Sequence, residues 1–334
     1  MSKTKRTNRR RLWLLTAGFV LLVACAVVWQ VFPPATWNEP AEIRDDNVLT
    51  VRFLDVGQGD CALLTVNDTA VLVDAGTVER PNLAAELLAA YGVTQLDAVI
   101  VSHPHADHIG GLPTVLERIP VKTLVMQLPR AAKTLGHYYD KTLALLSEKG
   151  VKRVEPTAGD TFSVGEIAFT VLGPLADEAE DLNDLSLCVR ADYGERKFLF
   201  CGDMTAAEEE TLLQVDDGLC ADVLKVAHHG SGGSNSREFL EAVHPEIAVV
   251  SCGLYNDYGH PHASALTRLA AVGADVYRTD KRGTVTVTTD GKTVAVSCEK
   301  TEETKEKTTK YREDTSSFSF FKTYSPNAAA TTAS

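Results

Sequence analysis

The sequence predicts an α/β protein in which two β-sheets pack face to face with helices outside them, a four-layer αββα sandwich. The first observation is that short apolar, β-branched runs alternate with helical patterns between residues 48 and 298. The second is that this alternation occurs twice, once in each half of that segment. Two similar β/α halves indicate two sheets that share one core. The apolar content of 44% is ordinary for a globular protein.

The first half predicts short strands, then a helix, a central strand and two further helices. The run Leu96–Ser102 is apolar and β-branched enough to be a buried strand. The other strands expected in this half are Leu49–Val56, Cys61–Val66 and Ala70–Asp74, and the expected helices are Asn82–Tyr91, Leu112–Arg118 and Lys133–Lys149.

The second half repeats this order and ends in a β-hairpin. The pair Asp290-Gly291 is a strong turn signal between two alternating runs, Thr284–Thr289 and Lys292–Ser297. Before the hairpin, the expected strands are Leu185–Ala191, Lys197–Cys201, Asp222–Ala227 and Ile247–Ser251, and the expected helices are Ala206–Gln214, Ser236–Val243 and Ala263–Val272.

The N-terminus has the pattern of a membrane anchor. Met1–Arg11 carries six basic residues and no acidic one, and Leu12–Phe32 is a 21-residue stretch without a charge. Such a stretch can cross a bilayer as a helix, and the basic flank stays in the cytoplasm. We therefore expect a single-pass protein of the cell membrane whose domain is extracytoplasmic. A cleaved secretory signal and a lipoprotein signal ending at Cys25 are the alternatives, and both place the domain outside as well.

Two further segments lie outside the expected domain of residues 48–298. Residues 33–47 are proline-rich and polar, which is typical of a linker. Residues 299–334 are rich in Thr, Ser, Lys and Glu and then Ala, which predicts a disordered tail.

The stretch Val101–Gly111 reads VSHPHADHIGG and carries the clearest chemical signal in the chain. Four potential metal ligands fall within six positions, namely His103, His105, Asp107 and His108. Imidazole with carboxylate suits Zn²⁺ and, less strongly, Mn²⁺ or Fe²⁺. A lone histidine is usually a surface or core residue. Here three of the nine histidines share one hexapeptide, followed by two glycines.

HxHxDH followed by Gly-Gly resembles the signature of the metallo-β-lactamase fold hydrolases. Further blocks narrow the resemblance to the extracytoplasmic hydrolase domain of the ComEC competence proteins, over about residues 48–298. That resemblance implies the αββα fold, a site for two divalent metal ions, and nuclease activity in DNA uptake. The blocks occur in this order: Leu54–Asp60, Val73–Gly76, Asn183–Leu187, Phe198–Asp203, Leu224–Ser231 and Gly259–His262.

A binuclear site needs ligands from the second half of the domain. Asp203 follows the strand Lys197–Cys201 after Gly202, and a carboxylate there can bridge two ions. His228 follows the strand Asp222–Ala227. The resemblance implies that Asp203 is the bridging ligand and that His228 completes one metal site. His229 is the alternative, because adjacent residues on a strand point to opposite faces.

The chain departs from the general superfamily pattern in one place. Many members carry a further histidine between the hexapeptide and the bridging aspartate, whereas His137 is the only histidine in that interval and lies in an expected helix. Asn183, Asp184 and Ser186 occupy the neighbourhood instead, as in ComEC-like domains. One metal position is therefore expected to be weak or filled by water. A turn with side-chain caps explains these three residues almost equally well.

Other residues are expected to support the site. The resemblance implies that Asp74 orients the metal loop through hydrogen bonds, as carboxylates around ligand histidines commonly do. Asp55 and Asp60 flank a Gly-Gln-Gly turn and are interpreted as loop or supporting groups. Ser231 begins an amide-rich SGGS segment that suits an anion, and Lys225 either adds charge or is a solvated strand residue.

The expected mechanism is metal-assisted hydrolysis, with Asp107 and His260 as the catalytic residues. Two cations about 3.5–4 Å apart lower the pKa of a bridging water, and the resulting hydroxide attacks phosphorus or a carbonyl. His260 is expected to donate a hydrogen bond to the substrate or to protonate the leaving group.

The charge leaves the substrate class open. Without the six basic residues near the N-terminus, 27 basic residues face 45 acidic ones, a net charge of −18. This argues against tight general DNA binding, though not against phosphodiester chemistry. The leading hypothesis is a membrane-anchored nuclease or phosphodiesterase. The alternatives are a hydrolase of a cell-wall phosphocholine ester or another small ester or amide, and a non-catalytic binding subunit. A role in DNA uptake would need a competence-channel partner, because the chain lacks the membrane spans of a channel.

The cysteine pattern indicates neither a zinc knuckle nor a defined disulfide set. Six cysteines lie in the expected domain, with no CxxC spacing. Several fall in apolar, strand-like runs, where a free cysteine behaves as a small hydrophobic residue. Disulfides are permitted outside the cell, but the sequence does not assign their pairing.

Overall fold

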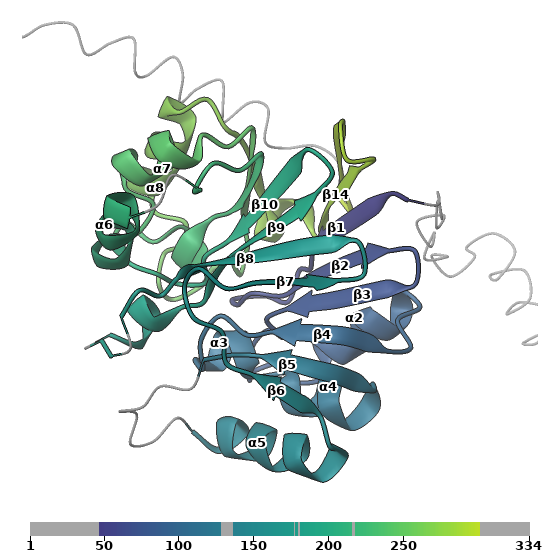
Figure 1. Ribbon diagram of the computed structural model, residues 1–334. Helices are drawn as coiled ribbons and strands as arrows, with labels where there is room; N and C mark the ends of the chain where they lie inside the picture. The colour runs from purple at the N-terminus through teal and green to yellow at the C-terminus, as the bar shows by residue number, and fades with distance from the viewer. Residues whose placement is uncertain (1–46, 128–135, 177, 180, 216–217, 301–334) are drawn as a thin grey trace, which may run out of the picture. The chain divides into compact units, whose positions relative to one another are not determined.

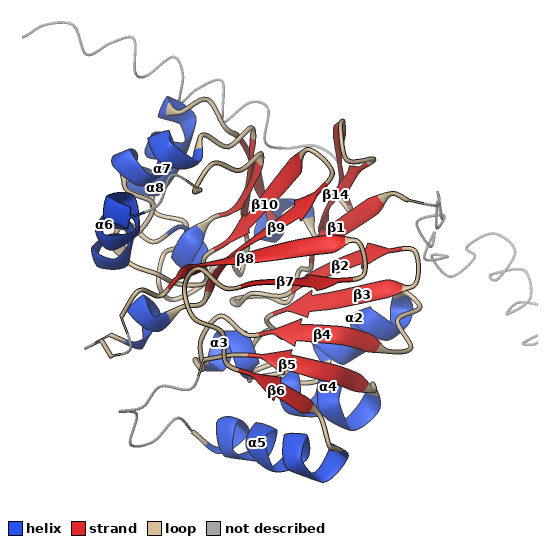
Figure 2. Ribbon diagram, viewed as in Figure 1, coloured by secondary structure: helices blue, strands red, loops and turns tan. Residues whose placement is uncertain are grey.

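The computed structural model describes residues 47–127, 136–176, 178–179, 181–215 and 218–300. The expected anchor at 12–32, the linker up to residue 46 and the tail from residue 301 lie outside these described residues. Figure 1 shows two β-sheets with helices beside them, and Figure 2 shows how strands and helices separate into layers. Within the described ranges, no helix is both long enough and apolar enough to span a bilayer.

The first sheet has the strand order β15-β14-β1-β2-β3-β4-β5-β6. Strands β3 to β6 run parallel to one another, whereas the pairings among β15, β14, β1, β2 and β3 are antiparallel. The parallel ends of β3 and β4 therefore bring Asp74 beside Ser102. The strands of this sheet are β1 (Leu49–Phe53), β2 (Ala62–Val66), β3 (Thr69–Val73), β4 (Leu96–Ile100), β5 (Val121–Val125), β6 (Lys152–Val154), β14 (Val285–Thr289) and β15 (Val294–Cys298).

The second sheet has the order β13-β12-β11-β10-β9-β8-β7. Strands β10 to β13 are parallel, so the chain leaves β10 and β11 at the same edge of the sheet. That edge carries Asp203 after β10 and the two histidines after β11. The strands of this sheet are β7 (Thr161–Val164), β8 (Ile167–Gly173), β9 (Cys188–Tyr193), β10 (Arg196–Phe200), β11 (Val223–Lys225), β12 (Ile247–Val250) and β13 (Asp275–Arg278).

Helices connect the parallel strands and lie on the outer faces of the sheets. The helices are α2 (Leu83–Ala90), α3 (Ala106–Ile109), α4 (Leu112–Arg118), α5 (His137–Lys149), α6 (Ala206–Val215), α7 (Arg237–Val243), α8 (Ala263–Ala271) and α9 (Thr279–Arg282). There are also two short 3₁₀ turns: η1 (Leu182–Leu185) comes before β9, and η2 (Ala227–Gly230) comes after β11.

Three apolar clusters hold the layers together. The central cluster joins the inner faces of both sheets, where the Phe53 and Phe200 rings stack with centroids 6.0 Å apart. A second cluster packs the first sheet against α2, α4 and α5, and a third packs the second sheet against α6, α7 and α8. This confirms the predicted four layers.

Several element boundaries and some whole elements differ from the expectation. The expected strand Leu185–Ala191 begins only at Cys188, because η1 ends at Leu185; the Asp181 carboxylate accepts a hydrogen bond from the Asn183 amide at its start. The strand expected at Asp222–Ala227 is shorter, since the backbone turns after Lys225. The sequence analysis did not predict strands β5, β6, β7, β8 and β13. Of these, β6 and β7 lie at sheet edges, and none of their residues is fully buried.

Candidate metal centre

The HxHxDH segment leaves the first sheet at the end of β4 and turns into the short helix α3. His105 is the N-cap of this helix in an extended conformation, so Asp107 and His108 lie within one helical turn. His103 and His108 are buried, while Asp107 keeps 30% of its side chain exposed. His103 Nε2 lies 2.9 Å from His105 Nδ1, which places these two rings together.

Asp203 enters the same space from the second sheet. Its backbone follows Gly202, whose φ is +52° and where an added Cβ would lie 2.6 Å from Ser102 Cβ. Only glycine accommodates both the left-handed backbone and this close approach. The Asp203 amide donates to Ser186 Oγ at 3.1 Å, and Asp203 Oδ1 lies 3.2 Å from His108 Nε2.

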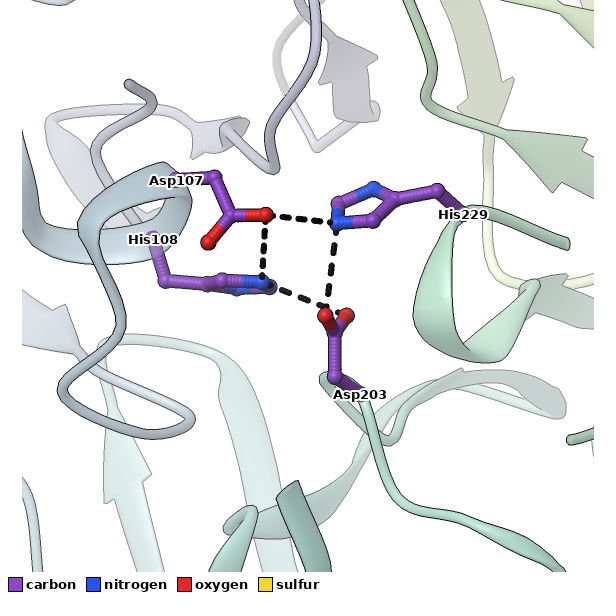
Figure 3. Close-up of side chains that lie close together, drawn as sticks. All are labelled: Asp107, His108, Asp203 and His229. Carbon is purple, nitrogen blue, oxygen red and sulfur yellow. Dashed lines mark hydrogen bonds and ion pairs between the residues drawn. The ribbon is translucent and has the colours of Figure 1, made fainter. Parts of the chain in front are cut away.

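The turn η2 brings His229 to the cluster. His229 Nε2 lies 3.2 Å from Asp107 Oδ2 and 3.4 Å from Asp203 Oδ2. His228 also approaches, with its Nε2 3.7 Å from Asp203 Oδ2, but a quarter of its side chain is exposed. Figure 3 shows Asp107, His108, Asp203 and His229 pointing toward one another.

Both adjacent histidines have left-handed backbones, with φ of 51° at His228 and 52° at His229. The alternation rule for strands therefore does not apply to them, because neither residue lies on a strand. Of the two, His229 belongs to the group whose ligand atoms all lie within 4.8 Å of one another, with Asp107, His108 and Asp203. The geometry thus favours the alternative, His229, over His228 for this group.

Asp74 fixes the metal loop from behind. Its carboxylate accepts hydrogen bonds from the Ser102 amide and the Ser102 hydroxyl, both at 2.8 Å, and lies 2.9 Å from His108 Nδ1. Because Nδ1 is engaged by Asp74, His108 directs Nε2 toward Asp203. This is the arrangement in which a carboxylate orients a ligand histidine.

An equivalent support holds His229. Its Nδ1 lies 2.9 Å from the Ser251 carbonyl oxygen and 3.2 Å from Asp60 Oδ1. Asp60 is itself paired with Lys225, whose Nζ lies 2.6 Å from Asp60 Oδ2, and both side chains are buried. The sequence indicates Asp60 only as a loop or supporting group and Lys225 as either a source of charge or a solvated strand residue; their pairing, between positions far apart in the chain, was not predicted.

The carboxylates of the cluster favour a positive charge on the groups that lie between them. Burial alone would lower the pKa of His108 and His229, but Asp203 with other carboxylates raises both pKa values well above the usual range. Burial opposes ionisation of Asp203, yet His229 and His108 hold its pKa well below the usual range. A divalent cation would meet the same demand and displace the imidazolium protons.

Orphaned polar atoms also fit a metal. His108 Nε2 and Asp203 Oδ1 are buried without a hydrogen-bond partner among the described residues. The two atoms face each other at 3.2 Å. Because buried polar atoms are almost always hydrogen-bonded, this nitrogen and this oxygen suit a shared cation. The donor set of two imidazoles and two carboxylates is one that zinc accepts.

His103 and His105 lie beside the four-residue group without belonging to it, and the ring centroid of His103 is 4.2 Å from that of His108. Ser186 Oγ lies 3.3 Å from His103 Nδ1, and Asn183 is buried, with no hydrogen-bond partner for its Oδ1 among the described residues. Asp184 instead accepts hydrogen bonds from the Thr205 amide and hydroxyl. Burial, followed by the nearby His108, lowers the pKa of His103, which keeps this imidazole neutral.

His260 lies beside the histidine pair, with ring centroids 5.5 Å from His228 and 6.2 Å from His229. Burial and these neighbours lower the pKa of His260 to about 4. Near pH 7 the ring is therefore neutral, which favours hydrogen-bond donation over proton delivery. Its Nδ1 is buried and has no hydrogen-bond partner in the part of the chain that the structure describes.

The expected anion segment is anchored rather than free. Ser231 Oγ accepts from the Gly233 amide at 3.3 Å, and the Arg268 guanidinium donates to the carbonyls of Gly232, Ser234 and Asn235. Ser231 is the C-cap of η2.

The chain matches known proteins along most of the described domain. The profile of the Metallo-beta-lactamase superfamily matches residues 54–254. ComE operon protein 3 of Bacillus subtilis is 32% identical over 281 residues, covering 79% of this chain and 35% of that protein. Recombination protein 2 of Haemophilus influenzae is 30% identical over 290 residues, covering 85% of this chain and 32% of that protein. The chain thus spans about a third of the length of these relatives.

A solved structure has the same fold. CmlA, a diiron β-hydroxylase from Streptomyces venezuelae, superposes with a TM-score of 0.50 at 18% identity, over 69% of this chain and 52% of that one. At this identity the likeness concerns the arrangement of strands and helices alone.

Proposed function

The chain belongs to the metallo-beta-lactamase superfamily, and from that premise we propose that it is a membrane-anchored, extracytoplasmic, metal-dependent phosphodiesterase that acts on DNA. The observation that carries the proposal is the convergence of Asp107, His108, Asp203 and His229 from both sheets. Two relatives support this substrate by their names, Recombination protein 2 of Haemophilus influenzae and Competence protein ComA of Neisseria gonorrhoeae.

The donor set assigns roles to the residues. Asp107, His108, Asp203 and His229 would hold one divalent ion, and His103 and His105 with Asp203 would hold a second, as Zn²⁺ or Mn²⁺. When bound, such ions lower the pKa of a coordinated water and neutralise charge on a phosphoryl oxygen.

The surrounding residues orient the donors and the substrate. Asp74 keeps His108 in one ring orientation, and the Asp60–Lys225 pair does the same for His229. His260 would donate a hydrogen bond from a neutral ring to a substrate oxygen. Tyr258 is 67% exposed and stacks on His260 with ring centroids 5.7 Å apart, so it offers a flat surface for a nucleobase.

The membrane anchor and outside placement in this proposal are supported by the 21-residue uncharged stretch Leu12–Phe32 and its basic flank. A partner that forms the DNA channel completes the proposed role in uptake. The second candidate is a hydrolase of a cell-wall phosphocholine ester or another small ester or amide, which the net charge of −18 after Arg11 favours.

Hydrolysis assays separate these functions. The purified full chain is incubated with bis(p-nitrophenyl) phosphate and with single-stranded DNA, in Zn²⁺ or Mn²⁺. Asp203→Asn removes a metal donor at constant shape, and Asp68→Asn, in the exposed β2–β3 turn, is the matched control. Cleavage of both substrates, lost only in Asp203→Asn, supports the proposal. Cleavage of the small diester alone favours the second candidate, and no turnover of either with metal bound rejects the phosphodiesterase.

A further inference from the structure

Two buried cysteines face each other on neighbouring strands of the second sheet. Strands β9 and β10 are antiparallel, and their register pairs Val189 with Phe200. The next pair in this register is Cys188 and Cys201. Both side chains are fully buried, and their Sγ atoms lie 2.9 Å apart.

This geometry suits a covalent bond better than a contact between thiols. Even two carbon atoms rest about 3.5–4.0 Å apart, and sulfur is larger. Directly opposed residues of antiparallel strands have Cα atoms about 4.5–5.5 Å apart, within the range of about 4.4–6.8 Å that disulfides span. A bond can therefore form without rearrangement of the strands. We propose that Cys188 and Cys201 are joined by a disulfide when the protein folds in oxidising surroundings.

The other described cysteines lack such a partner. Cys61 and Cys252 are buried, Cys220 is exposed and Cys298 is half-buried. None of these four sulfur atoms contacts another sulfur atom among the described residues. Among the described cysteines, the proposed bond therefore joins one pair and leaves four free thiols.

The cross-link would lie next to the candidate metal centre. Cys201 directly precedes Gly202 and Asp203, and Cys188 follows the Ser186 loop by two positions. The Asp203 amide already donates to Ser186 Oγ. A disulfide would tie the same two loops together covalently, so it would act as a positioning element for Asp203.

The chemistry requires an external disulfide, either on a thiol oxidoreductase or on a small molecule. The thiolate of one cysteine attacks the oxidant to give a mixed disulfide and one released thiol. The other cysteine then attacks the protein sulfur of that mixed disulfide and releases the second thiol. The two cysteines lose two electrons and two protons in total, and the oxidant is reduced to two thiols. Because both thiols are fully buried in the folded sheet, an external oxidant reaches them only before the strands close.

Peptide mapping tests the bond without relying on the hydrolase activity or on the location of the protein. The unmutated full chain is refolded in a glutathione buffer poised at about −180 to −210 mV. It is then denatured, alkylated and cut with trypsin. Cleavage after Arg190 and Lys197 separates the two cysteines, so a Cys188–Cys201 bond leaves two peptides joined by sulfur alone. Fragmentation distinguishes Cys201 from Cys220, which shares its peptide.

The expected result is a linked peptide pair that reductant separates. We also expect reductant during refolding to lower the Tm of the unmutated chain by roughly 5–10 °C. A Cys188→Ala/Cys201→Ala variant should show no such shift, while the matched Cys61→Ala/Cys252→Ala variant should retain it. Alkylated Cys188 and Cys201 after oxidative refolding, or a cross-link between other cysteines, would overturn the proposal.

Discussion

Lys225 Nζ lies 2.6 Å from Asp60 Oδ2 in the interior of the protein, where each side chain is about 5% exposed. The other carboxylate oxygen of Asp60 faces His229 Nδ1 at 3.2 Å. An ion pair that connects β11 to the loop after β1 therefore also places a carboxylate against a candidate metal ligand, whose Nδ1 is hydrogen-bonded to the Ser251 carbonyl oxygen.

Breaking this pair should destabilise the protein and misplace His229. Lys225→Met leaves the Asp60 charge buried without its main partner, so we expect a loss of about 3–5 kcal/mol in the free energy of unfolding. Urea denaturation of the single variants and of Asp60→Asn/Lys225→Met gives the coupling energy. Strict additivity of the two single effects would show that the pair does not act as a unit.

The two adjacent histidines should differ in their effect on metal binding. His229→Ala removes a donor that lies within the four-residue group, so we expect Zn²⁺ affinity to fall at least about 100-fold. His228→Ala should change it by less than about tenfold, because this ring is partly exposed and further from Asp203. Isothermal titration calorimetry with Zn²⁺ compares the two, and a larger effect at His228 would reverse the assignment.

Asp74 should act through His108 rather than by binding metal itself. Asp74→Asn keeps the shape but loses a negatively charged acceptor for Ser102 and His108, so metal affinity or activity should drop about 10–100-fold. Metal content after dialysis and the hydrolysis rate provide the measurement. Asp97→Asn, at a surface ion pair with Lys122, is the control that should leave both unchanged.

Metal removal should lower stability as well as activity. Without an ion, the cluster depends on imidazolium protons to balance Asp107 and Asp203, and a ligand at 100 times its Kd adds about 2.7 kcal/mol to stability. We expect chelation to lower the Tm and Zn²⁺ or Mn²⁺ to restore it. The Tm of Asp203→Asn should not change on chelation. An equal fall in the Tm of that variant would show that chelation acts at a site other than this cluster.

Tyr258 should contribute to the binding of DNA bases. Stacking on an aromatic ring is worth about 1–3 kcal/mol per base, so Tyr258→Ala should raise KM for single-stranded DNA roughly 10–100-fold, and Tyr258→Phe should not. The same oligonucleotide without bases is the reference substrate. An equal change in KM for the abasic strand would argue against stacking.

The layers could be predicted from local patterns, because β4 and β12 are mostly apolar and buried, β1 alternates buried apolar with polar residues, and the hairpin β14–β15 has a clear turn. Edge strands could not be predicted in the same way. Lys152–Val154 is short and largely exposed, so it lacks the apolar alternation that marks a strand. Its position is determined by pairing with β5, which is a tertiary effect.

The donors of the HxHxDH segment were evident because they lie within six positions of one another. The choice between His228 and His229 could not be made from the sequence. It depends on a left-handed backbone at both residues, and histidine does not by itself indicate that conformation. Likewise, Ser102 is an ordinary residue in sequence, yet its amide and hydroxyl both bind Asp74. Such contacts arise because β3 and β4 pair in parallel, and a single sequence does not show which strands are neighbours.

The pairing of β1 with β14 has a consequence for how the chain must fold. Strand β1 (Leu49–Phe53) lies between β2 and β14 (Val285–Thr289). The first strand of the domain therefore pairs with a strand that is synthesised about 230 residues later. Until the last hairpin has been synthesised, one edge of β1 is open to pairing with other chains. Contacts this distant in sequence slow folding. A ribosome that stalls before Val285 would thus release a product whose first sheet is incomplete and prone to aggregation.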